Sequence, residues 1–362
     1  MGVSTVVLAS LLNACGHVAS AVLPGSPVGT TPARKPDVRM QALSRAQVWR
    51  STNVASMDIA AGPKDRGAFP FRATVSCDYV DRTLSGASPK FACLMGDDEL
   101  KVKFGGANAE VYGEVAATRL LWALGFGADR MYPVRVICRG CPREFAGISR
   151  DNDEWVFDPA VIERKMDGVE FPGNGGWSFD ELEAIDEKAG GAPRAHVDAL
   201  KLLAVFMQHT DTKPQQQRLV CLGAKEADRA EDIDCSRPFM LFQDVGLTFG
   251  KANAFNVNHM AMHLKHWAAT PIWKDAKTCV GDLPKSLKGT LDDPVISEAG
   301  RAFLASLLTQ MSDRQIRDLF EVSRVELRLR APGKALSGFA TVDEWVSAFK
   351  QKRNEIVDHR CA

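Results

Sequence analysis

Short apolar runs separated by turn residues dominate the first third of the folded part of the chain and predict β-strands. The segments "FRATVSCDYV" (71–80), "PKFACLM" (89–95) and "ELKVKFG" (99–105) are separated by "LSGASP" and "GDD", which is typical of antiparallel strands joined by tight turns. Two further runs, "MYPVRVIC" and "AVIERKM", predict two more strands. We therefore expect a small five-stranded sheet.

The periodicity then becomes helical. In "NAEVYGEVAATRLLWALG" (108–125), Val111, Val115, Thr118 and Trp122 form one stripe, and Gly125 ends the pattern. A second helix is predicted in "HVDALKLLAVFMQ" (196–208), followed by the polar loop "HTDTKPQQQRLVC" (209–221) and the strand "PFMLFQDVG". Further helices are expected at the segments 258–269, 298–311, 312–327 and 341–357, the last two opening with capping boxes Ser312/Gln315 and Thr341/Glu344.

This order of elements predicts an α+β protein. A small, antiparallel β-rich part with one helix (68–166) precedes a larger, mostly helical part (167–362). Composition agrees with a globular protein, because 45% of the 362 residues are hydrophobic. With 45 basic and 45 acidic residues, the chain carries no global charge that would attract nucleic acid, and we expect no nucleic-acid partner.

The N-terminal residues predict export from the cytoplasm. Residues 1–21 combine an apolar stretch with Ala19-Ser20-Ala21, which is typical of a cleaved signal peptide. The stretch "LLNAC" also fits a lipoprotein signal, with Cys15 as the lipid anchor. Residues 22–67 predict a flexible linker, with little structure before Ala68. The mature protein would be periplasmic, anchored to a membrane as a lipoprotein, or extracellular, and no apolar run in it reaches the ~20 residues of a transmembrane helix.

Cysteine content supports the same compartment. Without Cys15, eight cysteines remain, and an even number in an exported chain favours disulfides, with 105 connectivities open. Proximity in sequence favours the pairs Cys77/Cys93, Cys138/Cys141 and Cys221/Cys235, which leaves Cys279 for Cys361. The alternative for "CRGC" is half of a zinc site, although no second such motif accompanies it.

Several residues match the needs of phosphoryl transfer: a Lys for phosphate oxygens, a carboxylate to orient it, a carboxylate near the attacking hydroxyl, and oxygen ligands for a metal. Lys103 lies in the third strand and Glu114 on the following helix. Asp211 and Gln216 lie in the polar loop, and Asp244 ends an apolar strand, where an acid is costly unless paired or metal-bound. The alternatives are a solvated Lys103, and a solvent-exposed helix face formed by Glu110 and Glu114, which lie four residues apart.

The pair "HTDTKPQQQ" and "FQDVG" resembles the catalytic loop and metal-binding motif of atypical protein-kinase-like folds, which include HipA-type, phosphatidylinositol and secretory-pathway kinases. The segment "GEVAATRLLWALGF" is similar to the HipA-type helix, and the chain also resembles uncharacterised exported bacterial proteins. The resemblance covers roughly residues 70–330. It implies a two-lobed fold that binds ATP with Mg²⁺ or Mn²⁺ and transfers phosphate to an unidentified protein or small-molecule hydroxyl acceptor.

The resemblance also implies roles for single residues. Asp211 would be the catalytic base and Lys213 would neutralise the transferred phosphoryl group. Gln216 and Asp244 would hold the metal. The nucleotide would be bound by Lys103, by Glu114 as the residue that orients it, by Glu163 and its neighbours as the adenine hinge, and by the turn with Ser85, Gly86 and Ser88 over the phosphates.

One position departs from the family pattern, which has Asn where this chain has Gln216. The extra methylene moves the amide oxygen by about 1 Å, enough to alter a tight Mg²⁺ site. Gln215 is an alternative ligand. The sequence therefore leaves open an inactive pseudokinase that binds nucleotide or partner proteins. A metal-dependent hydrolase using Asp211 and Asp244 would require more ligands than the sequence offers.

Histidines offer two weaker candidates. His259, His263 and His266 have i, i+4, i+7 spacing, which would place them on one helix face as metal ligands, although a partly exposed helix without a metal is the favoured interpretation. His209 either acts as a general base or braces the loop that holds Asp211. The chain lacks a G-x-S-x-G motif, which argues against a serine hydrolase.

Overall fold

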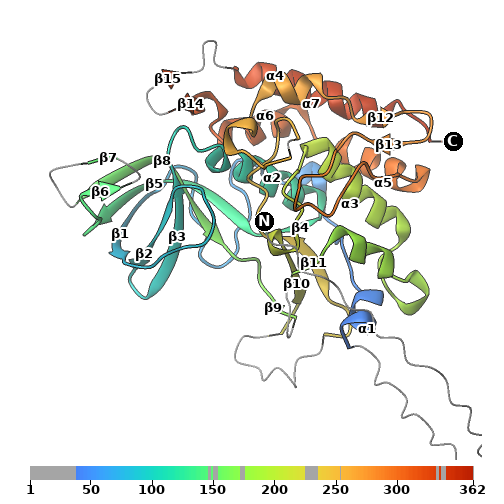
Figure 1. Ribbon diagram of the computed structural model, residues 1–362, viewed down its shortest axis with the longest axis horizontal. Helices are drawn as coiled ribbons and strands as arrows, with labels where there is room; N and C mark the ends of the chain where they lie inside the picture. The colour runs from blue at the N-terminus through green and yellow to red at the C-terminus, as the bar shows by residue number, and fades with distance from the viewer. Residues whose placement is uncertain are drawn as a thin grey trace, which may run out of the picture. The chain divides into compact units, whose positions relative to one another are not determined.

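Five strands close into a small barrel in the first half of the chain (Figure 1). The computed structural model describes residues 38–145, 148–149, 154–171, 176–224, 235–252, 254–331, 334–335 and 340–361. The barrel strands are β1 (Thr74–Val80), β2 (Lys90–Met95), β3 (Asp98–Phe104), β5 (Arg130–Arg139) and β8 (Trp155–Arg164), in the order β1-β2-β3-β8-β5. The five strands expected from the sequence are confirmed, but β1 pairs in parallel with β5, so the predicted sheet closes on itself.

Helix α2 (Glu110–Leu124) follows β3 and ends at Gly125, which adopts the left-handed conformation at φ 87° as the glycine that ends the helix. Apart from Trp122 and its first residue, Glu110, every residue of α2 is buried. Its apolar side chains belong to the large core of the helical part, whereas the barrel interior forms a separate cluster around Phe91, Leu100 and Phe157. Thus α2 contacts both the barrel, chiefly at β5, and the helical part, at α6 (Asp313–Val322).

A second sheet contains the strand that begins directly after the polar residues 209–216, which the sequence predicts to be the catalytic loop. Its strands are β4 (Gly127–Ala128), β11 (Phe239–Phe242), β10 (Gln217–Cys221) and β9 (Val169–Glu170), in the order β4-β11-β10-β9. The sequence predicted only the β11 strand. β10 was missed because its five residues are all buried, Gln217 and Arg218 included, so it shows no alternation of apolar and polar positions.

The remaining core is helical. Helices α3 (Arg194–Met207), α5 (Glu298–Leu308), α6 (Asp313–Val322) and α7 (Val342–Val357) match predicted segments, and both predicted capping boxes are present. The described part also contains the short helix α4 (Leu264–Ala269), the strand pairs β6 (Glu144–Phe145) with β7 (Ile148–Ser149), β12 (Trp273–Asp275) with β13 (Val280–Gly281), and β14 (Leu329–Ala331) with β15 (Lys334–Ala335).

The segment before Ala68 is a correction to the sequence analysis, which expected a flexible linker. Residues 38–44 form helix α1 (Val38–Ser44), and Leu43, Val48 and Val54 are fully buried in the same core as α2 and α3. Gln47 and Trp49 bridge to β11 and to Phe126. Scattered apolar residues therefore anchor the segment despite its loop-like composition. The signal sequence, Cys15 and the linker up to residue 37 lie outside the described residues.

The segment "NHMAMHLKHWAA" is a second correction. It forms a 3₁₀ turn at Asn258–Met260 and then α4, with His263 at the N-cap, in place of one helix. Met262 interrupts the helix because its φ is 46°, in the left-handed region. The three histidines consequently do not share one helix face.

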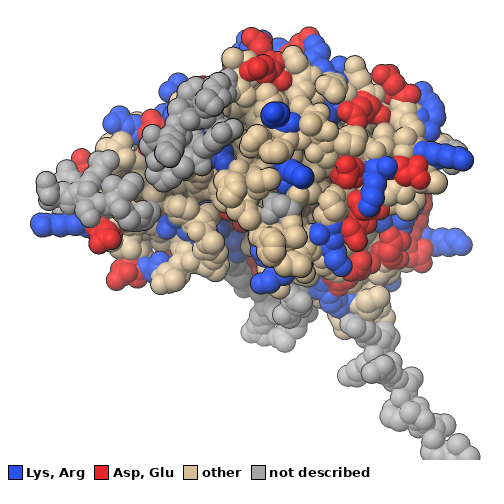
Figure 2. Space-filling view, turned by 45° about the horizontal axis from the view of Figure 1, so that its top comes forward, with Lys and Arg blue, Asp and Glu red and all other residues tan. Residues whose placement is uncertain are grey.

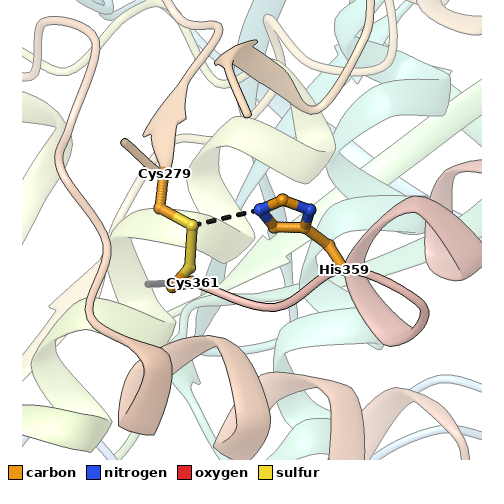
Figure 3. A group of neighbouring side chains, drawn as sticks. All are labelled: Cys279, His359 and Cys361. Atoms are coloured by element: carbon orange, nitrogen blue, oxygen red, sulfur yellow. Dashed lines mark hydrogen bonds between the residues drawn. A yellow bond between two sulfur atoms is a disulfide. The ribbon is translucent and has the colours of Figure 1, made fainter. Parts of the chain in front are cut away.

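Four disulfides join the cysteines as proximity predicted: Cys77–Cys93, Cys138–Cys141, Cys221–Cys235 and Cys279–Cys361. The "CRGC" motif is thus a disulfide, not half of a zinc site. His359 Nε2 lies 3.2 Å from the Cys279 sulfur (Figure 3), and Cys279, His359 and Cys361 are close enough together to resemble a set of metal ligands. The two cysteine sulfurs are joined in a disulfide, however, and are not thiolates that could bind a metal.

Surface charge is mixed. Acidic and basic side chains alternate over the face seen in Figure 2, in agreement with their equal numbers in the sequence. Among the described residues, no helix is both long and apolar enough to cross a membrane.

The Cys279–Cys361 disulfide should contribute more to stability than Cys138–Cys141. It spans 82 residues, against 3 for the shorter loop, and a long loop restricts the unfolded chain more. Replacing Cys279 and Cys361 by Ser should lower the free energy of unfolding by about 4 kcal/mol, and the same change at Cys138 and Cys141 by about 2 kcal/mol. Urea unfolding followed by tryptophan fluorescence measures both, and equal losses would contradict the expectation.

Candidate functional site

Lys103 is buried at the end of β3 and is surrounded by three carboxylates. Its side chain is 1% exposed, and its ammonium group forms ion pairs with Glu114, with Glu110 at 3.1 Å and with Asp244 at 3.4 Å. A buried ammonium group is costly unless it is paired. The expected pairing of Lys103 with Glu114 is therefore present, and the alternative of a solvated Lys103 does not hold.

The charges in this cluster do not balance. Burial lowers the pKa of Lys103, but Asp244, Glu114 and Glu110 raise that pKa well above its usual value, so the group stays charged. Burial raises the pKa of Glu114, and Lys103 offsets this only in part. Burial also raises the pKa of Asp244, but Lys103 and the Gly246 N–H lower it more, which leaves it below its usual range. Even without a charge on Glu114, the acids Glu110 and Asp244 face one ammonium group, which leaves an excess of negative charge among these four side chains.

Two glycines allow α2 to approach Asp244 closely. Glu110 and Glu114 lie one helical turn apart and so share a face of α2. A Cβ on Gly113 would lie 2.5 Å from the Gly246 carbonyl oxygen, and a Cβ on Gly246 would collide with the Glu110 side chain. The close contact between the "QDVG" segment and α2 thus depends on both glycines having no side chain.

Asp211 occupies the loop after α3, which ends with Gln208 in the left-handed conformation at φ 53°. The Asp211 carboxylate is 5% exposed. Its Oδ2 accepts hydrogen bonds from Lys213 Nζ at 2.8 Å and from Gln216 Nε2 at 2.6 Å, and its Oδ1 accepts one from Asn256 Nδ2 at 2.9 Å. The loop is therefore an organised cluster of polar groups around a buried carboxylate, not a solvated turn.

The second sheet links this loop to Asp244. β10 and β11 are antiparallel, with Gln217 opposite Phe242. Just beyond that pair, the Gln216 carbonyl oxygen accepts hydrogen bonds from the backbone N–H groups of Gln243 at 2.8 Å and Asp244 at 3.2 Å. The backbone at Gln216 thereby fixes the position of Asp244 relative to Asp211.

These groups meet in one cavity of about 600 Å³. The lining combines basic and acidic side chains, with Lys90, Lys101, Lys213 and Lys288 on one hand and Glu110, Asp211 and Asp244 on the other. Ser85, Gly86, Ser88, Gln215, Gln216 and Asn256 line it as well. The volume falls within the range of small-molecule sites, and the mixture of lysines and carboxylates suits a phosphate group bound together with a cation.

The sequence-predicted residues separate into two groups. Asp211, Lys213, Gln216, Asp244, Ser85 and Gly86 line the cavity, and Lys103 and Glu114 contact Asp244 directly or through the cluster. Glu163 does not line it. Glu163 lies in β8 between β3 and β5, and its carboxylate pairs with Lys101 at 2.5 Å. The adjoining Met166 N–H, in the expected hinge, donates to Asp129 Oδ1 at 2.8 Å.

Several residues of the site were missed from sequence alone. Glu110 was considered only together with Glu114 in the alternative of a solvent-exposed helix face, yet its side chain is 13% exposed and pairs with Lys103. Its spacing of four from Glu114 was the available signal. Lys90 in β2 lies directly opposite Lys103 in β3. The antiparallel pairing that the sequence predicts for these two strands was the available signal for Lys90. Asn256 carries no local signal, because its contact with Asp211 joins segments 45 residues apart.

His209 anchors the start of the Asp211 loop against the second sheet. It is fully buried against Phe242, with the two rings 5.2 Å apart and nearly perpendicular. Among the described residues, neither ring nitrogen has a hydrogen-bond partner. Burial lowers the pKa of His209 to about 4. A neutral imidazole packed on an aromatic ring is typical of a residue that braces the loop holding Asp211. It does not fit the alternative role of a general base.

Comparisons with known proteins give little guidance. No protein-family model matches the chain, and no curated protein matches it. Among solved structures, this chain is similar to the crystal structure of CtkA, a proinflammatory kinase of Helicobacter pylori, with 11% sequence identity and a TM-score of 0.42. The alignment covers 79% of this chain and 96% of the kinase. At this TM-score the likeness decides neither fold nor activity.

His209 should make the protein sensitive to acid. The unfolded chain takes up a proton near the ordinary histidine pKa of 6.5, whereas the folded protein resists it down to about pH 4, so stability is lost as pH falls through this range. The loss between pH 7 and pH 5 should be about 2 kcal/mol, and His209→Phe should remove it. Urea unfolding at both pH values measures this. The exposed His259→Gln variant is the control, and an unchanged pH dependence in His209→Phe would refute the assignment.

Proposed function

We propose that this protein is an exported atypical kinase, which binds ATP with Mg²⁺ or Mn²⁺ and transfers a phosphoryl group to a hydroxyl-bearing acceptor. The observation that carries the proposal is the buried Lys103, held by Glu114 and Asp244, behind a cavity that also contains Asp211. Such an arrangement supplies the few groups that phosphoryl transfer requires. The five-stranded barrel, α2 and the helices behind them suit the two-lobed kinase-like fold that the sequence suggests.

The phosphates of the nucleotide would be bound at the lysine-rich side of the cavity. Lys103 would contact the α- and β-phosphates, and Glu114 would keep its ammonium group in position. Lys90 and Lys101 line the same cavity and would add positive charge. The turn with Ser85 and Gly86 would cover the phosphates. The adenine hinge that the sequence predicts at Glu163 is left out of the proposal, because Glu163 pairs with Lys101 and does not line the cavity.

The acidic residues suit a divalent cation. The Oε2 atom of Glu114 is buried and has no hydrogen-bond partner among the described residues. Glu110, Glu114 and Asp244 each offer one carboxylate oxygen as a possible metal ligand, and these three oxygens lie within 4.8 Å of one another. Hard cations such as Mg²⁺ and Mn²⁺ prefer oxygen ligands, so this donor set fits. Asp244 would hold the ion, with Gln216 as the second ligand expected from the sequence. The ion would neutralise charge on the phosphates.

Asp211 would act on the acceptor. Its carboxylate would accept the hydrogen bond of the attacking hydroxyl and orient it. As the hydroxyl oxygen bonds to the γ-phosphorus, the bond from that phosphorus to the bridging oxygen would break, ADP would leave, and Asp211 would take up the hydroxyl proton. Lys213, 2.8 Å from Asp211 Oδ2, would neutralise the phosphoryl group during transfer. Among the described residues, Asp211 Oδ1 accepts a hydrogen bond from Asn256 alone, so this oxygen has a second acceptor position for an acceptor hydroxyl.

Export is part of the proposal. Four disulfides among the eight cysteines after Cys15 favour an oxidising compartment. They support the signal sequence at residues 1–21, with either cleavage or a lipid anchor at Cys15. The protein would then be periplasmic, attached to a membrane as a lipoprotein, or extracellular.

One observation favours a second candidate, an inactive pseudokinase that binds nucleotide or partner proteins. Gln216 replaces the Asn of the family pattern, and its Nε2 donates to Asp211 at 2.6 Å. The extra methylene of Gln216 displaces its amide oxygen by about 1 Å from the place where the shorter Asn would hold a metal. The two candidates share nucleotide binding and differ in transfer.

Nucleotide binding should depend on Asp244. Calorimetry with ATP and Mn²⁺ should detect binding to the wild type, and Asp244→Ala should weaken it by at least about 10-fold, because the variant loses a metal ligand and a partner of Lys103. Asp358→Asn is the control, since Asp358 is exposed at the end of α7. Absence of binding to the wild type would exclude both nucleotide-binding candidates.

Phosphoryl transfer should depend on Asp211. Incubation with ATP labelled at the γ-phosphate should label a protein or small-molecule acceptor, and Asp211→Asn should reduce the rate by about 10²-fold or more, the range expected for a lost general base. Mass spectrometry locates the label. Binding without any transfer would favour the pseudokinase, and transfer that survives in Asp211→Asn would refute the role of this residue.

A further inference from the structure

Asn256 reaches the site from a turn that follows the "QDVG" segment. Its backbone is left-handed, with φ 51°, a conformation that Asn tolerates better than most residues. The Leu287 N–H donates to the Ala254 carbonyl oxygen at 2.9 Å and holds the turn against the next segment. Asn256 lines the same cavity as Asp211 and Asp244.

The hydrogen bonds of Asn256 determine how its amide is oriented. Nδ2 donates to Asp211 Oδ1 at 2.9 Å and to Ser286 Oγ at 3.2 Å. The reverse orientation would bring the amide oxygen against the Asp211 carboxylate, and two acceptors repel. Oδ1 is therefore directed away from Asp211, and it is buried with no hydrogen-bond partner among the described residues. A buried acceptor without a donor is unfavourable, so it calls for a ligand.

Gln216 binds Asp211 through its amide nitrogen as well, but it differs in its other contacts. Its Nε2 donates to Asp211 Oδ2, and its backbone carbonyl accepts from Gln243 and Asp244. Its contacts are those of a residue that fixes the loop. The two amides thus bind the two oxygens of Asp211, and of the two it is the Asn256 oxygen that is buried without a partner.

We propose that Asn256 Oδ1 is the amide ligand of the divalent cation, in the role that the sequence assigned to Gln216. This inference rests on the proposed nucleotide and metal site. Three observations support it: the unpartnered oxygen, the cavity that Asn256 shares with Asp244 and Glu110, and the excess of carboxylates over ammonium groups at Lys103. The shorter amide that the family pattern has in the loop is supplied here from another segment of the chain. Gln216 is then a positioning residue for Asp211.

The test compares variants by their affinity for Mn²⁺. Mn²⁺ is titrated into the full-length protein saturated with a non-hydrolysable ATP analogue, and free Mn²⁺ is followed by electron paramagnetic resonance. Asn256→Gly removes the amide without strain, since Gly adopts φ 51° readily. Asn256→Asp keeps an oxygen ligand but cannot donate to Asp211. Gln216→Ala tests the sequence-predicted ligand, and Gln351→Ala, at an exposed position of α7, is the matched control.

Asn256→Gly should bind Mn²⁺ at least about 10-fold more weakly, whereas Asn256→Asp, Gln216→Ala and the control Gln351→Ala should stay within about 3-fold of the wild type. Thermal unfolding without ligands should show a lower Tm for Asn256→Asp, because two carboxylates then face each other, and Mn²⁺ should restore it.

Three results would overturn the inference alone. Wild-type affinity in Asn256→Gly would exclude Asn256 as a ligand, and its Oδ1 would then be assigned to the acceptor hydroxyl. Equal weakening in Asn256→Asp and Asn256→Gly would mean that the N–H group matters and the oxygen does not. A selective loss in Gln216→Ala would restore the sequence-predicted ligand. If the wild type binds neither the analogue nor Mn²⁺, the proposed function fails together with the inference.

Discussion

The site depends on a single constraint, which is that the ammonium group of Lys103 is buried and must be compensated. Burial of a charged group in a protein interior is unfavourable unless partners surround it, and here Glu110, Glu114 and Asp244 do so. The three acids come from two separate segments, the first turns of α2 and the end of β11. One buried charge therefore joins the barrel strand β3, helix α2 and the second sheet. Removing any of the acids would disturb all three elements.

The same cluster explains why two glycines and one backbone carbonyl matter. Gly113 and Gly246 allow α2 to approach the segment that carries Asp244, and the Gln216 carbonyl connects that segment to the Asp211 loop. The proposed metal site and the proposed acceptor site are consequently held by one continuous set of contacts. We infer that a change at α2 would reach Asp211 through Asp244 and Gln216.

Much of this arrangement could be predicted from the sequence where the signal was local. The short apolar runs of β1 to β3 between turn residues, the periodicity of α2 and α3, and the capping boxes of α6 and α7 each reflect contacts within a short stretch of chain. The pairing of Lys103 with Glu114 followed from a strand and the helix after it. Long-range packing was not accessible: the burial of Leu43 and Val54, the fully buried strand β10 and the contact of Asn256 with Asp211 depend on segments that only the fold brings together. Met262 shows the reverse case, since its left-handed backbone ends a helical pattern that the sequence alone supports.

The central claim is that the carboxylates beside Lys103 hold a divalent cation together with the phosphates of a nucleotide. Crystals grown with Mn²⁺ and a non-hydrolysable ATP analogue test it most directly, because Mn²⁺ scatters X-rays anomalously and can be located without reference to a mechanism. The account predicts an anomalous peak at about 2.2 Å from an Asp244 oxygen, with phosphate density between this peak and Lys103. Bound nucleotide with no peak at Asp244, or no nucleotide in the cavity, would contradict it.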